Sequence, residues 1–275
     1  MPPDQKHADS KAALPASEPG AAKPDPILVC ENVRKSFGGL VAVDVDHLEV
    51  QRGWITALIG PNGAGKTTLF NVLSGFDSAE TGTWRFDGRP MQKLPPHRSA
   101  GRGMVRTFQL TKVLRGMPII DNMRLGAPGQ RGERFVPGLL QLWRNQEEEV
   151  TRRAETLLSQ FNLTRMRDEY GGALSGGQQK LLEIARALMV EAKMLMLDEP
   201  VAGVNPALTD SILEQVVKLR DDGMTILFVE HEMDVVMGIS DWVVCMAEGR
   251  IIAEGPPEVV GRHPEVIDAY LGTDE

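Results

Sequence analysis

The chain has 275 residues, 42% of them hydrophobic, and a formal net charge of −8 at pH 7. This length suits one large domain or two small ones with a sizeable core, and the acidic balance argues against nucleic acid as a partner, because phosphate backbones bind basic surfaces. No run of about 20 apolar residues predicts a membrane span, no apolar N-terminal segment predicts a secretory signal, and two isolated cysteines are typical of a cytoplasmic protein.

Residues 1–26 are predicted to be a disordered tail. They are rich in Pro, Ala, Ser, Lys and Asp and show no apolar period. Such a segment cannot bury enough apolar surface to offset its chain entropy. A docking peptide is the alternative interpretation of this composition.

The next part of the chain favours strands and one helix. The helix is expected at 66–74, after a glycine-rich turn and before Gly75, which ends it. Short apolar or alternating runs predict the strands, and the third of them is typical of a fully buried strand that ends at Gly60. These predicted strands are 27–30, 43–50, 55–59 and 82–88.

The second half of the folded chain combines a helical region with alternating strands and helices. The middle, about 110–190, shows apolar side chains at helical spacing. Beyond residue 190 a helix is expected at 206–220 with Asn205 as its N-cap. Strands are predicted at 194–197, 226–229 and 242–246. The alternation predicts an α/β fold with a parallel sheet and ligands at the carboxyl ends of its strands.

The segment GPNGAGKT matches GxxxxGK[ST], the pattern of a phosphate-binding loop, or Walker A motif. Its glycines let the backbone turn tightly so that N–H groups point at phosphate oxygens, and the following helix adds the positive end of its dipole. Lys66 is expected to supply a full positive charge for β- and γ-phosphates, and the Thr67 hydroxyl to ligate Mg²⁺. The alternative, a plain glycine-rich turn, is disfavoured by the strand before it and the helix after it. The loop residues are Gly60, Pro61, Asn62, Gly63, Ala64, Gly65, Lys66 and Thr67.

An apolar run at 195–197 ends in two carboxylates, Asp198 and Glu199. Successive strand residues point to opposite faces, so the two side chains are expected to do different work. Asp198 would hold Mg²⁺ through water, while Glu199 would face the γ-phosphate and activate a water. Alone, such an ending is typical of a solvated strand end; together with the phosphate-binding loop it predicts a site of nucleotide hydrolysis.

A third motif, LSGGQ, precedes a predicted helix and comprises Leu174, Ser175, Gly176, Gly177 and Gln178. In one interpretation it is simply a capped helix, with Ser175 as the N-cap. In the other, its exposed N–H groups and the Ser175 hydroxyl bind a γ-phosphate held by another subunit.

The combination of GPNGAGKT, LSGGQ and LMLDEP, in this order and spacing, resembles the ATP-binding subunit of ABC transporters over about residues 27–273. The resemblance implies an α/β P-loop NTPase of ABC type, with a RecA-like, mostly parallel sheet core and an antiparallel β subdomain. It also implies an α-helical signature subdomain at about 110–190 and a family-specific C-terminal tail at about 255–273.

Further site residues follow only from this resemblance. Phe37 lies where the family places an aromatic that stacks on adenine. Gln109 matches the glutamine that reaches Mg²⁺ and the attacking water, in the loop that faces the membrane subunit. His231 matches the histidine that contacts the γ-phosphate. ATP would lie in a head-to-tail dimer, between the loop and Thr68 of one chain and the LSGGQ motif of the other. Asn205 stands where many members carry an aspartate; it can still cap its helix, but at this position the resemblance leaves a charged contact between subunits open.

Stretches at 199–206, 236–241 and 264–272 are similar to the larger ATP-binding subunit of branched-chain amino-acid importers. This similarity implies Mg²⁺-dependent ATP hydrolysis on the inner face of the cell membrane. The implied partners are a second ATP-binding subunit, identical or homologous, transmembrane permease subunits and a solute-binding protein. A lipopolysaccharide-export ATPase and a soluble ABC ATPase that serves as an assembly factor are the alternatives, and only the partner distinguishes them.

Overall fold

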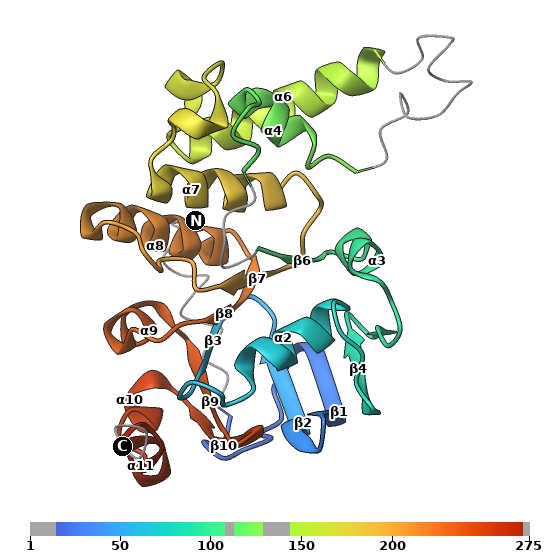
Figure 1. The fold of residues 1–275 in the computed structure, drawn as a ribbon, viewed down its shortest axis with the longest axis vertical. Helices are drawn as coiled ribbons and strands as arrows, with labels where there is room; N and C mark the ends of the chain where they lie inside the picture. The colour runs from blue at the N-terminus through green and yellow to red at the C-terminus, as the bar shows by residue number, and fades with distance from the viewer. Residues whose placement is uncertain (1–14, 108–112, 129–143, 272–275) are drawn as a thin grey trace, which may run out of the picture. The chain divides into compact units, whose positions relative to one another are not determined.

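The computed structural model describes three stretches of the chain, residues 15–107, 113–128 and 144–271 (Figure 1). They form two compact units. Unit 1 spans Met1–Leu94 and Val229–Glu275, and unit 2 spans Pro95–Phe228. Within the described stretches, no helix is both long and apolar enough to cross a bilayer.

Unit 1 contains an antiparallel sheet whose strand order is β2-β1-β4-β5. Its main feature is a long hairpin in which Phe37 of β1 pairs with Leu40 of β2 at the tip. The three strands predicted here are present, but the one predicted at 82–88 ends at Phe86, before a turn at 87–88. Strand β1 is far longer than its apolar run, because backbone pairing with β2 continues through polar residues. The strands are β1 (Pro26–Phe37), β2 (Leu40–Gln51), β4 (Thr81–Phe86) and β5 (Arg89–Pro90).

A second set of strands in unit 1 positions the phosphate-binding loop. The strand order is β10-β9-β3, with β3 parallel to β9 and β10 antiparallel to β9. All five residues of β3 are buried, as its continuous apolar sequence predicts. The strands are β3 (Ile55–Ile59), β9 (Trp242–Ala247) and β10 (Arg250–Gly255), and the helices are α2 (Lys66–Ser74), α9 (Met233–Ile239), α10 (Pro257–Val260) and α11 (Pro264–Leu271).

The prediction of a disordered tail is wrong for residues 15–25, which the structure places against the strands of unit 1. Lys23 is 6% exposed. Its Nζ lies 2.7 Å from the Ala21 carbonyl oxygen and 3.3 Å from Oε2 of Glu254. It also lies 4.3 Å from the ring centroid of Trp242. Composition does not reveal the partners Glu254 and Trp242, which lie more than 200 residues further along the chain. Residues 1–14 lie outside the described residues.

Unit 2 combines three neighbouring strands, in the order β8-β7-β6, with five of the helices that the structure describes. Strands β6 and β7 are parallel, and β7 is buried throughout. Helices α4, α6 and α7 pack on one another in the upper part of Figure 1, with the apolar side chains of Leu158, Phe161 and Leu182 buried. The strands are β6 (Met104–Arg106), β7 (Met194–Asp198) and β8 (Thr225–Val229); the helices are α3 (Pro96–Gly101), α4 (Ile119–Arg124), α6 (Arg144–Gln160), α7 (Gly176–Ala187) and α8 (Pro206–Asp221), with 3₁₀ turns at Thr164–Met166 and Gly171–Ala173.

Candidate nucleotide-binding site

The loop at 60–67 follows the buried strand β3 and leads into α2, as the sequence predicts. Gly60, the first residue of the loop, has a tightly constrained backbone. Its φ is 144°, and a Cβ there would lie 2.1 Å from the carbonyl oxygen of Met246 in β9, so only glycine fits. Gly65 is the N-cap residue of α2 and provides no side-chain cap. The first N–H groups of a helix have no partners within it, so this uncapped end can serve an anion.

Lys66, the lysine of the loop, bends back over its own backbone. Its Nζ donates to the carbonyl oxygens of Gly60 at 2.6 Å and of Pro61 at 2.9 Å. The residue is only 5% exposed. Thr67, the next residue, is exposed. The ammonium group therefore occupies the inside of the loop, where a phosphate would replace the two carbonyl oxygens as its partner.

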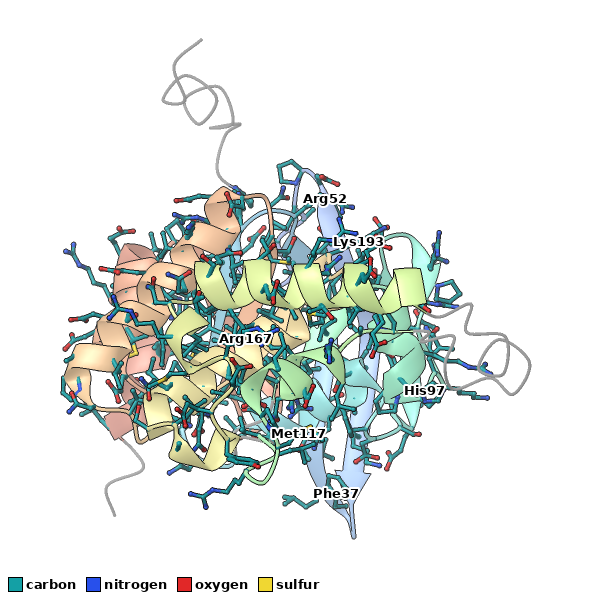
Figure 2. All side chains as sticks on the ribbon, turned by 90° about the horizontal axis from the view of Figure 1, so that it is seen from above. Phe37, Arg52, His97, Met117, Arg167 and Lys193 are labelled. Atoms are coloured by element: carbon teal, nitrogen blue, oxygen red, sulfur yellow. The ribbon has the colours of Figure 1, made fainter. Side chains whose placement is uncertain are left out.

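Two further predicted residues belong to unit 1. Phe37 is 50% exposed at the tip of the β1–β2 hairpin, where Figure 2 labels it, and Nζ of Lys35 lies 4.8 Å from its ring centroid. His231 is exposed just after β8, and its backbone N–H donates to the buried carboxylate of Glu230 at 3.1 Å. Both side chains are thus presented to solvent rather than used in the core.

Asp198 is the last residue of β7 and is 6% exposed. Its Oδ2 lies 2.8 Å from Nη2 of Arg106, at the end of the parallel neighbour β6. The two side chains are 6% and 7% exposed, so this is a buried ion pair. A carboxylate and a hydroxyl such as that of Thr67 are oxygen ligands of the kind that Mg²⁺ prefers, so these residue types fit the predicted metal.

Glu199 does not continue the strand that precedes it. Its φ is +47°, a left-handed conformation that is uncommon for a residue with a side chain. The strand alternation from which its orientation was predicted therefore does not apply to it. Its carbonyl oxygen lies 3.3 Å from Nζ of Lys180, a residue of α7 that is 7% exposed. Backbone strain of this kind is concentrated at functional sites.

The LSGGQ motif forms the start of α7, with Ser175 as its N-cap. Ser175 and Gln178 make a reciprocal capping box: the Ser175 N–H donates to Oε1 of Gln178 at 2.9 Å, and Oγ accepts from the Gln178 N–H at 3.4 Å. Ser175 and Gly176 are exposed, whereas Gly177 is buried. A Cβ on Gly177 would lie 2.8 Å from Cδ1 of Leu208 in α8, so the helices pack closely at this glycine.

The remaining predictions have mixed outcomes. Asn205 caps α8 as predicted, since its Oδ1 accepts the Ala207 N–H at 2.9 Å. Gln109 lies outside the described residues. Among the described residues, no group of three or more His, Cys, Asp or Glu side chains forms a metal cluster.

Sequence reasoning missed three residues that contact the predicted site. They are Arg106, which pairs with Asp198, Lys180, which contacts the backbone of Glu199, and Tyr270, whose hydroxyl accepts the Gly60 N–H at 2.9 Å. Tyr270 lies inside the stretch at 264–272 that carries the similarity to importer subunits, and Arg106 lies three residues before Gln109. No periodicity or spacing marks any of the three, because each of these contacts joins segments distant in sequence.

Comparison with known proteins identifies the family of the chain. The sequence profile of the family described as "ABC transporter" matches residues 43–202, and that of "Branched-chain amino acid ATP-binding cassette transporter" matches residues 250–275. The structure is similar to that of a nucleotide-free ATP-binding cassette from an ABC transporter, with a TM-score of 0.77, 36% identity and coverage of 89% of this chain and 98% of the other. An ADP-bound cassette gives a TM-score of 0.77 with 38% identity, covering 90% and 99% of the two chains.

A glycine-rich loop between a buried strand and a helix, in a fold of this type, defines an ATP-binding cassette, an ATPase of the P-loop NTPase class. The chain belongs to the ABC transporter family.

The most similar relatives that the comparison gives come from one group of this family, the branched-chain amino acid transport proteins. The chain is 42% identical to the probable branched-chain amino acid transport ATP-binding protein LivG of Archaeoglobus fulgidus, over 90% of this chain and 96% of the relative. It is 41% identical to BraF of Pseudomonas aeruginosa and 40% identical to LivG of Escherichia coli, both named as high-affinity branched-chain amino acid transport ATP-binding proteins. Each of these two matches covers 90% of this chain and 98% of the relative.

Proposed function

We propose that this protein binds and hydrolyses ATP to drive the uptake of branched-chain amino acids or similar small solutes. The observation that carries the solute class is the identity of about 40% over 90% of the chain to transport subunits of that name. The match of residues 250–275 to a branched-chain amino acid profile supports the same assignment. These relatives favour import over lipopolysaccharide export and over a soluble assembly factor.

The residues divide the chemistry of hydrolysis between them. Phe37 stacks on adenine, and backbone N–H groups of the loop at 60–68 receive the phosphates. Lys66 exchanges its two carbonyl partners for β- and γ-phosphate oxygens, which neutralises charge as the bond to the γ-phosphate breaks. Glu199 accepts a proton from the attacking water, and His231 contacts the γ-phosphate.

Mg²⁺ supplies charge neutralisation on the phosphates when it is bound. Thr67 would ligate it through its hydroxyl, Asp198 would hold it through water, and Gln109 is assigned to it by the family resemblance. What supports Asp198 is its buried carboxylate at the end of β7, which pairs with the guanidinium of Arg106.

The complete ATP site needs a second ATP-binding subunit, identical or homologous. Four phosphate charges call for donors on every side, and one loop supplies donors on one side only. The exposed start of α7, with Ser175 and Gly176, is a helix N-terminus suited to the γ-phosphate of the other subunit. Closure around ATP and opening after hydrolysis would then form a two-state switch.

This switch would act on transmembrane permease subunits, with a solute-binding protein supplying the amino acid. The protein would therefore work as a peripheral subunit on the inner face of the cell membrane. A pull-down of the Glu199→Gln protein from detergent-solubilised membranes tests this assignment. Recovery of amino acid permease subunits supports it, recovery of a lipopolysaccharide exporter overturns the solute class, and recovery of no membrane subunit overturns the transport role.

The catalytic assignment is tested by Glu199→Gln in the purified protein. Removal of the proton acceptor should lower kcat for phosphate release by about 100-fold or more while ATP binding is kept. A nucleotide-bound dimer should then accumulate in size-exclusion chromatography. The matched control is Glu248→Gln, because Glu248 is exposed and has the same left-handed backbone, with φ of 48°. Normal turnover in Glu199→Gln would exclude this role.

The role of the loop is tested by Lys66→Ala. Loss of the ammonium group should weaken ATP binding by about 10-fold or more, because a charge-assisted contact to phosphate disappears. Lys93→Ala is the control, since Lys93 is exposed and lies outside the predicted site. Unchanged ATP affinity in Lys66→Ala would contradict the proposed loop.

A further inference from the structure

The start of the phosphate-binding loop is held by the C-terminal helix of unit 1. The parallel pairing of β3 with β9 ends at Ile59, which pairs with Cys245. Gly60 follows this last pair, and its N–H donates instead to the hydroxyl of Tyr270 at 2.9 Å. The first backbone N–H beyond the β3–β9 pairing is thus bound by a tyrosine side chain instead of by a neighbouring strand.

Both polar backbone groups of Gly60 are therefore held by side chains. Tyr270 holds the N–H, and Nζ of Lys66 holds the carbonyl oxygen at 2.6 Å. In the exchange of partners proposed above, the bond to Lys66 is lost when that ammonium group turns to a phosphate, whereas the bond to Tyr270 requires no such exchange. Tyr270 is the partner that can keep Gly60 in place in both states.

The Tyr270 phenol is suited to this role. It is carried by α11 (Pro264–Leu271), which contacts β10, and Val266 on the same helix is 3% exposed. Burial raises the pKa of Tyr270 to about 12, although the bond from Gly60 acts in the opposite direction. The hydroxyl is therefore protonated at neutral pH, and its oxygen accepts from an N–H without a charge.

We propose that Tyr270 is a positioning residue for the nucleotide: through Gly60 it holds the phosphate-binding loop in the conformation that receives the phosphates. A loop fixed beforehand loses less conformational entropy on binding, so the gain appears as affinity for the nucleotide. The proposal rests on the assignment of the 60–68 loop to the phosphates of ATP. It gives the C-terminal segment, which matches the branched-chain amino acid profile, a role in ATP binding.

The test is Tyr270→Phe, which keeps the ring and removes only the hydroxyl. The loss of one hydrogen bond should raise the Kd and the KM for ATP by about 5-fold. At saturating ATP, kcat should stay within about two-fold, because the residue touches no reacting atom. Hydrogen exchange at the Gly60 amide, measured without nucleotide, should become faster. Tyr170→Phe is the matched control: it is the other tyrosine of the chain, and it is 59% exposed.

Three outcomes decide the proposal. Weaker ATP binding together with faster exchange at Gly60 supports it. Unchanged ATP affinity in Tyr270→Phe overturns it, and so does a lower melting temperature without a change in affinity, which indicates a packing role only. Lys66→Ala distinguishes a failure of the role proposed for Tyr270 from a failure of the assignment of the loop to ATP. If Lys66→Ala loses ATP binding while Tyr270→Phe does not, this inference fails alone; if Lys66→Ala keeps its affinity, the assignment of the loop fails as well.

Discussion

Arg106 and Asp198 form a buried ion pair in unit 2, with 2.8 Å between Nη2 and Oδ2. They lie at the ends of the parallel neighbours β6 and β7. A carboxylate of this kind is costly to bury alone, because the interior does not solvate its charge. Arg106 therefore provides the positive charge that compensates Asp198, the residue to which the proposed function assigns Mg²⁺.

The pair predicts that Arg106→Met destabilises the nucleotide-free protein. Removal of one partner leaves an unpaired buried charge, so the free energy of unfolding should fall by about 3–5 kcal/mol in urea titrations. Added Mg²⁺ and ATP should recover part of this loss, because a bound cation again compensates Asp198. Arg98→Met, at an exposed position of α3, is the control. A loss that Mg²⁺ and ATP leave unchanged would contradict the link between this pair and the metal.

The left-handed backbone of Glu199 predicts that replacing this residue with glycine makes the protein more stable but inactive. Glycine adopts a φ of +47° without the steric cost of a Cβ, so Glu199→Gly should raise the free energy of unfolding by about 0.5–1 kcal/mol. The same change should abolish ATP hydrolysis, because the proposed proton acceptor is gone. Glu248→Gly, with φ of 48°, should gain similar stability and keep its activity. A destabilised Glu199→Gly protein would show that the conformation carries no strain.

Local sequence signals were sufficient for the elements of the loop. The buried run at 55–59, the glycines after it and the helix at 66–74 are confirmed to the residue, because hydrophobic runs and glycine punctuation act over a few residues. The cap at Asn205 was found for the same reason. What such signals miss are strands whose length is set by a partner, as in the polar second half of β1.

Contacts between segments distant in sequence could not be predicted from the sequence. Nothing near Lys23 indicates that Glu254 lies beside it, and nothing near Gly60 indicates Tyr270, because each pair is more than 200 residues apart. The error about residues 15–25 has this origin. Their composition suggests too little apolar surface for a fold, but the contact energy comes from a carboxylate and an indole in unit 1.

The contacts of Glu254 predict that Glu254→Ala releases the N-terminal segment. This carboxylate is 1% exposed and accepts from the Ala21 N–H, from Nζ of Lys23 and from Nε1 of Trp242 at 3.0 Å. Its removal takes the acceptor from three buried donors, one of which is the charged ammonium group of Lys23, so the free energy of unfolding should fall by about 3–5 kcal/mol. Limited proteolysis should then cut near Lys23. Glu258→Ala, at an exposed position of α10, is the control, and resistance equal to the parent protein would contradict the expectation.

His47 predicts a dependence of stability on pH in the same part of unit 1. Its ring lies between two carboxylates, with Nδ1 3.0 Å from Glu31 and Nε2 3.2 Å from Glu49. Burial lowers the pKa of His47, but the hydrogen bonds and charges of the two glutamates outweigh it, so the pKa is raised above its ordinary value of 6.5. The protonated ring therefore favours the folded state.

This stabilisation is fully present below the unfolded pKa, near 6.5, and is lost as the pH rises through the higher pKa of the folded protein. Urea unfolding from pH 6 to pH 8.5 should accordingly show a decline in the parent protein that is smaller in His47→Gln. The difference should stay below about 1 kcal/mol, because Glu31 is half-exposed and solvent screens the pair. His97→Gln, at an exposed position of α3, is the control and should keep the parent's pH dependence. If the free energy of unfolding declines equally with pH in His47→Gln and in the parent protein, the two carboxylates do not stabilise a protonated His47.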